Sequence, residues 1–402
     1  MKTKRTSLLV ICLFAGLSTL TGCNTNRGEK IVIWHDKTDA VVKVLSDAIK
    51  EKMPNENVEF VHKDSLTDTL KLVGNDANSA PDMFIFAHDK IGLFKTVGIL
   101  EPMDELVDPS FYSDYEDLTL SAMKYENVRY GIPLYYETTL FLYNKELLSS
   151  ADVPTTTEKL YTYMKDNTDA RRYGFVEQHS TPYYSAAWIN GFGGSILHDD
   201  GKPGLDDQAT IESLTYHRKF VEYMPKTSAD YSTVNTLFLE KSADCVIGGP
   251  WMISSAKEAN IDIGVAPMPT IDCTGKALSP YCGIQGVYAL KVATKEQGRK
   301  ERISKILQLF TDPQIGGDLA LTSGCAPANK ESYEISGVKD NEIVKAIVSS
   351  SESAIPMPSR PEMDIMWLET GKLLSDVNMK GADIASSCEK YQKEAENLIS
   401  QM

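Results

Sequence analysis

Two charged tripeptides and one isolated glutamate hold the side chains of this sequence that could do chemistry. His35-Asp36-Lys37 and His88-Asp89-Lys90 each combine an imidazole, a carboxylate and an ammonium group, and Glu137 stands alone after two tyrosines. Such groups can act as acid–base catalysts, hold a metal ion, or form charge-assisted hydrogen bonds with a hydroxylated ligand. They also occur at ordinary solvated strand ends, so their meaning depends on whether the fold brings them together.

Apolar runs and helical patterns alternate around the two tripeptides. Residues 31–34, 58–61 and 84–86 are predicted as buried strands, and apolar residues at helical spacing predict helices over 42–49, 66–73, 299–310 and 365–374. This alternation predicts βαβ units and a parallel sheet. Ligands of such sheets bind beyond the carboxyl ends of the strands. Because each tripeptide follows a strand, we expect both acid–base pairs at one edge of one sheet.

The four tryptophans suggest what such an edge could bind. Aromatic rings pack against the apolar C–H faces of a sugar ring, while carboxylates and ammonium groups bind its hydroxyls. Trp251 follows a Gly-Pro turn and Trp367 falls in a helical pattern, so each is either a stacking surface or a core residue. Trp34 lies within a predicted strand, and we expect it in the core.

The N-terminus predicts an exported lipoprotein. Lys2, Lys4 and Arg5 precede an apolar run over residues 8–20, which is typical of a signal peptide and too short to span a bilayer. The run ends in Leu-Thr-Gly-Cys, which resembles the bacterial lipobox. We therefore expect a signal peptide over residues 1–22, acylation of Cys23, and a polar tether over 23–30 that holds the protein at the outer face of the cell membrane.

Composition narrows the class further. The formal net charge of -15 without a basic run makes nucleic acid an improbable partner. The length of 402 residues exceeds one typical core, so two domains are expected. Cys245 lies in an apolar run and is expected to be a buried thiol, whereas Cys273 and Cys282 flank a turn signal and could form a local disulfide.

Several motifs resemble one family in order and spacing. They are IVIW and DK within 31–37, PDMFIFAHDKIG at 81–92, YGIPLYYETTLFLYNKELL at 130–148, TPYY at 181–184, GGPWM at 248–252 and IPMPSRPEMDIMW at 355–367. From about residue 30 to 400 the chain is similar to solute-binding proteins of ABC transporters, in the maltose/maltodextrin-binding branch. The resemblance implies a monomeric protein that captures such oligosaccharides, or a different oligosaccharide, and delivers them to membrane permease subunits.

The resemblance also implies site residues. The family has polar pairs that bind sugar hydroxyls, a hinge-side glutamate, aromatic platforms, an apolar floor and an acidic residue that aligns only loosely. In this sequence they correspond to Asp36, Lys37, Asp89 and Lys90, to Glu137, to Tyr183, Tyr184, Trp251 and Trp367, to Met357, and to Asp68. Some positions depart from the family pattern: Phe86 stands where Trp is frequent, Lys90 where Arg is frequent, and Ile253 in place of a second Trp. Some polar and stacking contacts of the family should therefore be reduced here.

The fold implied by the resemblance is α/β with two lobes of the periplasmic-binding-protein type, each a mainly parallel sheet flanked by helices. Residues 31–135 plus 286–337 would form the N-terminal lobe, and 139–282 plus 342–402 the C-terminal lobe. The chain would cross between lobes near residues 136–137, 283–285 and 337–339, with the sugar in the cleft between them.

A glycoside hydrolase and a surface lipoprotein without transport are the alternatives. A glycosidase would need two carboxyl groups, such as those of Asp89 and Glu137, about 5 Å or about 6.5–9.5 Å apart. Each candidate carboxylate lies beside a cation or in a hinge segment, so we expect none to have the apolar surroundings that raise a catalytic pKa. We expect His35 and His88 to bond backbone groups, and predict neither a metal nor another cofactor.

Overall fold

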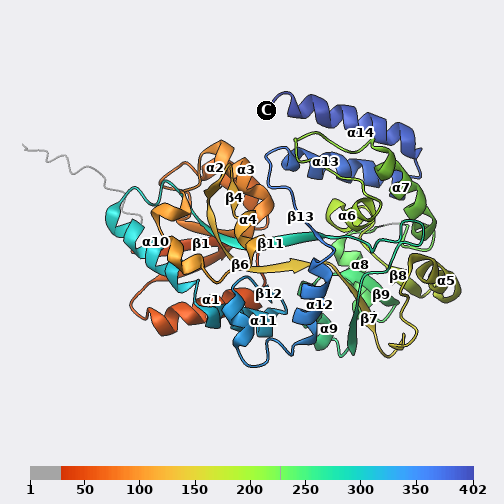
Figure 1. Cartoon of the computed structure of the whole chain (residues 1–402), viewed down its shortest axis with the longest axis horizontal. Helices are drawn as coiled ribbons and strands as arrows, with labels where there is room; N and C mark the ends of the chain where they lie inside the picture. Colours follow the sequence, from red (N-terminus) through yellow and green to blue (C-terminus); the bar gives the residue numbers. More distant parts are fainter. Residues whose placement is uncertain (1–28, 227) are drawn as a thin grey trace, which may run out of the picture.

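The computed structural model describes residues 29–226 and 228–402, which form two lobes side by side (Figure 1). The predicted signal peptide, Cys23 and most of the tether lie outside these residues. Within them, no helix is long and apolar enough to cross a membrane.

The first lobe is built on a seven-stranded sheet. Its strands, in spatial order, are β12 (Ala326–Pro327), β6 (Gly131–Thr138), β11 (Tyr281–Ala289), β3 (Met83–Ala87), β1 (Ile31–His35) and β2 (Val58–His62), with β13 (Ile355–Pro356) beside the start of β11. Around it lie α1 (Asp39–Lys52), α2 (Leu66–Val73), α3 (Ile91–Val97), α4 (Asp117–Ala122), α10 (Gln297–Leu309), α11 (Pro313–Ser323), the hairpin β4 (Lys124–Tyr125) and β5 (Val128–Arg129), and the short turns η2 (Met103–Glu105), η3 (Pro109–Tyr112) and η5 (Lys330–Glu334).

The second lobe has a four-stranded sheet, ordered β10 (Ile263–Ala266), β7 (Leu140–Asn144), β9 (Ala243–Gly248) and β8 (Tyr173–Val176). Its helices are α5 (Thr157–Asn167), α6 (Pro182–Gly191), α7 (Gln208–Val221), α8 (Tyr231–Leu239), α9 (Ile253–Glu258), α13 (Met363–Leu374) and α14 (Ile384–Ile399), with the π-helical turn η6 (Ser375–Met379) after α13. Helix α12 (Glu342–Ser351) packs against strands of both sheets.

The predicted two-lobed α/β fold is confirmed, and every strand and helix predicted around the tripeptides is present. The expected mainly parallel pairing holds for β1, β2 and β3, but β11 runs antiparallel to β3 and β6, and in the second sheet only β8 and β9 are parallel. The reason is the path of the chain. Strand β6 leaves the first lobe at the cleft edge and β11 re-enters there, so the two must run in opposite directions.

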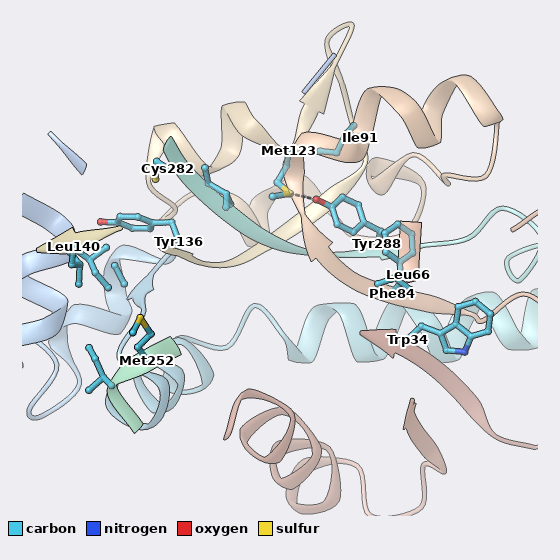
Figure 2. Packing of buried hydrophobic residues seen from close by; sticks show 14 of the residues in the cluster. Trp34, Leu66, Phe84, Ile91, Met123, Tyr136, Leu140, Met252, Cys282 and Tyr288 are labelled. Atoms are coloured by element: carbon cyan, nitrogen blue, oxygen red, sulfur yellow. Dashed lines mark hydrogen bonds between the residues drawn. The ribbon is translucent and has the colours of Figure 1, made fainter. Parts of the chain in front are cut away.

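An apolar cluster fixes the strands that carry the site (Figure 2). Phe84 of β3 stacks on Tyr288 of β11 with ring centroids 4.8 Å apart, and the Tyr288 hydroxyl donates to the Met123 sulfur. The same cluster reaches Leu140 and Met252 in the second lobe. Such dense packing resists displacement of the strand ends above it.

The cysteine and tryptophan expectations can be placed as well. Cys245 is fully buried, and Trp34 packs in the core, so both predictions are confirmed. Within the described residues Cys273 and Cys282 are free thiols, the first exposed and the second buried in β11. The suggested disulfide between them is therefore absent from this structure, in which Cys282 is buried in the sheet and Cys273 is exposed.

Candidate functional site

The edge of the first sheet that faces the second lobe collects polar side chains from four strands. Strands β1 and β3 are parallel neighbours, with His35 beside Ile85, and Asp36-Lys37 and η1 (His88–Lys90) follow them. Strand β6 ends and β11 begins at the same edge, where Glu137 lies opposite Gly283. The predicted convergence of the two tripeptides at one sheet edge is thus confirmed.

A chain of polar contacts forms the floor of this edge. The Lys37 ammonium lies 2.7 Å from an Asp36 carboxylate oxygen and donates to the Gln285 amide oxygen at 2.6 Å. The Gln285 amide nitrogen donates in turn to Glu137 at 2.9 Å. Lys37 and Gln285 are nearly inaccessible to solvent, so each needs these partners to offset the loss of water.

Glu137 differs from the sequence expectation. Burial raises the pKa of its carboxyl above the ordinary value, although Lys37 and the hydrogen bond from Gln285 act in the opposite direction. The expectation that no cleft carboxyl has a raised pKa is therefore wrong for Glu137. Glu137 is the one position of β6 that keeps some solvent exposure, but its carboxyl is surrounded by protein at the cleft floor, where it accepts a hydrogen bond from Gln285.

The second polar cluster joins the two lobes. The indole nitrogen of Trp367, on α13, donates to an Asp89 carboxylate oxygen at 2.9 Å. The Lys90 ammonium lies 3.3 Å from the same carboxylate and 3.1 Å from that of Asp364. Burial lowers the pKa of Lys90, but the two carboxylates outweigh it and the net shift is upward, so the ammonium stays charged.

Both histidines bond the backbone, as expected. The Ile284 amide donates to Nδ1 of His88 at 3.2 Å, so Nε2 carries the proton and donates to the Met357 carbonyl at 3.0 Å. Burial lowers the pKa of His88, which favours this neutral form. His35 Nδ1 accepts from the Lys37 amide at 3.2 Å. Within the described residues, no group of three or more His, Cys, Asp or Glu side chains is placed to hold a metal ion.

The second lobe contributes aromatic rings. Trp251 lies in η4 (Pro250–Met252), directly after the carboxyl end of β9, and Tyr183 lies in the first turn of α6. Their ring centroids are 6.3 Å apart. Trp367 packs edge-on against Tyr281 at 5.8 Å. The side chains of Trp251, Tyr183 and Trp367 are only partly buried, so these three are not ordinary core residues.

Tyr184 lies behind this aromatic wall. It is buried and packs edge-on against Tyr183. Burial raises its pKa, and a hydrogen bond with Trp251 acts in the opposite direction. The contacts of Tyr184 therefore support the positions of two wall residues, and it does not itself line the cavity.

Met357 and Asp68 have contrasting positions. The Met357 side chain lines the cavity beside Gly283, where its methyl carbon would lie 3.3 Å from any added Cβ. Asp68, on α2, is 82% exposed, with Lys71 as an ionic neighbour at 3.9 Å. Of the predicted contact residues, Tyr184 and Asp68 are the two that line neither part of the cleft.

Two adjoining cavities make up the cleft. The larger, about 300 Å³, is lined by Phe86, Ala87, Asp89, Lys90, Glu137, Tyr183, Trp251, Gly283, Gln285, Met357 and Trp367. The smaller, about 160 Å³, is lined by Asp36, Lys37, Thr38, Val41, Tyr135, Glu137, Trp251, Ser323 and Cys325. Glu137 and Trp251 line both cavities, which therefore adjoin between the polar edge of one lobe and the aromatic wall of the other.

Sequence reasoning missed two polar residues of this region. Gln285 bridges Lys37 and Glu137, and Asp364 pairs with Lys90. Gln285 had a usable signal, because it is a lone amide in the otherwise apolar strand YCGIQGVYA. Asp364 had none, since its partner is 274 residues away in the sequence.

Comparisons with known proteins agree with this geometry. A family model described as "Bacterial extracellular solute-binding protein" matches residues 45–346. The chain belongs to this family. The resemblance to its maltose/maltodextrin-binding branch, inferred from the motifs, is confirmed by the relatives that follow.

Two curated relatives and one solved structure illustrate the likeness. The maltotriose-binding protein of Pyrococcus abyssi is 32% identical, over 91% of this chain and 81% of its own length. The maltodextrin-binding protein MdxE of Bacillus subtilis is 29% identical, over 92% and 90%. The maltose/maltodextrin-binding domain MalE of Bdellovibrio bacteriovorus, solved bound to maltotriose, is 26% identical with a TM-score of 0.83, over 92% of this chain and 100% of that one.

The raised pKa of Glu137 predicts a pH dependence of stability. A carboxyl whose pKa is higher in the folded state contributes stability that is fully present below the unfolded pKa, near 4.5, and lost as pH rises through the folded pKa. Glu137→Gln removes this loss. Urea denaturation from pH 4 to pH 8 should show the variant gaining unfolding free energy relative to wild type as pH rises. A relative gain on acidification would contradict the assignment.

Proposed function

We propose that this solute-binding protein captures maltodextrin-type oligosaccharides outside the cell and delivers them to the permease subunits of an ABC importer. The observation that carries the proposal is the cleft, in which carboxylate and ammonium groups of one lobe face tryptophan and tyrosine rings of the other. The sugars named for the Pyrococcus, Bacillus and Bdellovibrio proteins support the same ligand class.

The chemistry of the cleft suits a neutral polyol. Each hydroxyl of a glucose unit can donate to Asp36, Asp89 or Glu137 and accept from Lys37 or Lys90, and such charge-assisted bonds are the strong ones. The apolar faces of the same rings can lie against Trp251 or Trp367. Because every cation here is already paired with a carboxylate, the site has little unbalanced charge with which to attract an ionic ligand.

The same geometry supports binding by closure. We assign residues 31–135 plus 286–337 to one lobe and 139–282 plus 342–402 to the other, with the crossings as the hinge. The start of β11 and its partner β13 extend the first sheet into the second of these ranges. A sugar that contacts both lobes binds the closed form better than an open one and so shifts the equilibrium toward closure. The closed surface, presented by a monomer, would be the form that the permease recognises.

A glycoside hydrolase is the second candidate, because the raised pKa of Glu137 is a property of catalytic acids. Two observations favour binding. Glu137 already accepts a hydrogen bond from Gln285, and Asp89 accepts one from Trp367, so each carboxyl is engaged in holding the cleft. The family model also describes proteins that bind solutes.

Substitution of cleft residues tests the proposal. Asp89→Ala should weaken maltotriose binding roughly ten- to hundred-fold, since hydrogen bonds to a charged group contribute about 1.5–3 kcal/mol. Trp251→Ala, which removes a stacking face from the opposite lobe, should cost as much. Isothermal titration calorimetry on the folded variants measures both effects.

Asp244→Ala is the matched control. This aspartate is also buried and paired with a base, Arg172, but it lies away from the cleft. The Asp244→Ala variant should bind maltotriose with the affinity of wild type. Equal losses of maltotriose affinity in Asp89→Ala, Trp251→Ala and Asp244→Ala would show that the effect is general destabilisation and not a loss of cleft contacts. Chromatography of the sugar after hours with wild type should show it intact, and shortened products would establish the hydrolase instead.

Membrane anchoring at Cys23 is the remaining part of the proposal. Cys23 is the last residue of the Leu-Thr-Gly-Cys motif. A curated relative from Streptococcus pneumoniae is named as a solute-binding lipoprotein. Cys23→Ala should release the protein from the membrane fraction, because acyl chains supply the membrane affinity. Fractionation and immunoblotting measure the release, and titration calorimetry should show unchanged sugar affinity. Equal retention of mutant and wild type at the membrane would exclude the anchor.

A further inference from the structure

A bridge of three charges crosses from one lobe to the other beside the sugar cavity. The Asp364 carboxylate on α13 lies 3.1 Å from the Lys90 ammonium and 3.2 Å from the Lys71 ammonium on α2. Both lysines belong to the first lobe, and Figure 1 shows α2 and α3 on the side of that lobe nearest α13. We call Lys71, Asp364 and Lys90 the charge bridge.

The charge bridge lies between the cavity and solvent. Side-chain exposure increases outward along the contacts, from 7% for Asp89 and 11% for Lys90 to 29% for Asp364 and 38% for Lys71. Asp89 and Lys90 line the larger cavity, whereas Asp364 and Lys71 do not. Asp364 and Lys71 therefore lie beyond Lys90, on the solvent side of this part of the cavity.

One residue of the charge bridge and one residue of the aromatic wall lie on the same helix, α13. Asp364 and Trp367 are three residues apart on α13, a spacing that places both on the same helix face. Trp367 contacts Asp89 while Asp364 contacts the neighbouring Lys90. Helix α13 is thus held against η1 by two adjacent contacts, one in the cavity and one at its rim.

The Asp364 carboxylate competes with the Asp89 carboxylate for the Lys90 ammonium. Burial raises the pKa of Asp364, but Lys90 and Lys71 outweigh it and the net shift is downward, so the group is charged at neutral pH. Lys90 is consequently held toward the rim by Asp364 as well as toward the cavity by Asp89. A sugar ring extending past Lys90 would have to displace this ion pair.

We propose that Asp364 is a specificity-determining residue: the charge bridge is an end wall of the sugar groove and limits how many hexose units the closed protein accepts. This inference rests on the proposed function. An ordinary exposed ion pair, by contrast, would contribute little to stability and nothing to ligand choice.

The test compares a short and a long ligand in matched variants. Dissociation constants for maltotriose and maltoheptaose are measured by titration calorimetry for wild type, Asp364→Ala, Lys71→Ala and Asp364→Glu. Asp376→Ala is the control, because Asp376 also contacts two lysines, Lys380 and Lys390, but entirely within the second lobe.

Asp364→Ala should lower the ratio of the maltoheptaose to the maltotriose dissociation constant roughly five-fold or more, about 1 kcal/mol. Lys71→Ala should lower it in the same direction, while Asp364→Glu and Asp376→Ala should keep the wild-type ratio. An unchanged ratio in Asp364→Ala, with maltotriose still bound, overturns the end wall and leaves the proposed function standing. Wild type that binds neither sugar overturns the proposed function and the inference with it.

Discussion

The antiparallel pairing of β6 with β11 is the constraint on which the rest of the structure depends. Strand β6 carries the chain out of the first lobe, and β11 brings it back beside the same edge. Every position of β11 is buried, so the amide of Gln285 must find its partners inside the protein. It finds Lys37 and Glu137, and these contacts make the cleft floor polar without leaving its charges unpaired.

In the function that we propose, the two lobes divide the work of recognition. Charged groups come from strand ends of the first lobe, where β1 and β3 are held by the packing of Phe84 on Tyr288. The aromatic rings that we propose to stack on the sugar come from the second lobe, on α6, η4 and α13. Neither surface alone can satisfy both the hydroxyls and the faces of a sugar ring, so strong binding requires the lobes to meet. Trp367 and Asp364 are two of the residues through which the lobes touch.

Much of this arrangement follows from the sequence. The period of apolar residues predicts that both tripeptides follow strands, and because parallel strands end at the same edge of a sheet, Asp36 and Asp89 are predicted to lie near each other. Local patterns, however, could not reveal partners that depend on tertiary structure. Asp364 meets Lys90 only because the fold packs α13 against η1, and the pKa of Glu137 is raised because the folded protein buries its carboxyl. The mixed direction of the strands likewise follows from the chain's return between lobes.

A crystal structure of the protein with maltotriose tests binding between the lobes most directly. The sugar should occupy the cavity lined by Glu137 and Trp251, with hydroxyls at hydrogen-bond distance, about 2.5–3.2 Å, from the Asp89 or Glu137 carboxylate. At least one glucose ring should lie against Trp251 or Trp367. A cavity that remains empty at saturating maltotriose, or sugar bound only on the outer surface of one lobe, would contradict the assignment of this cleft.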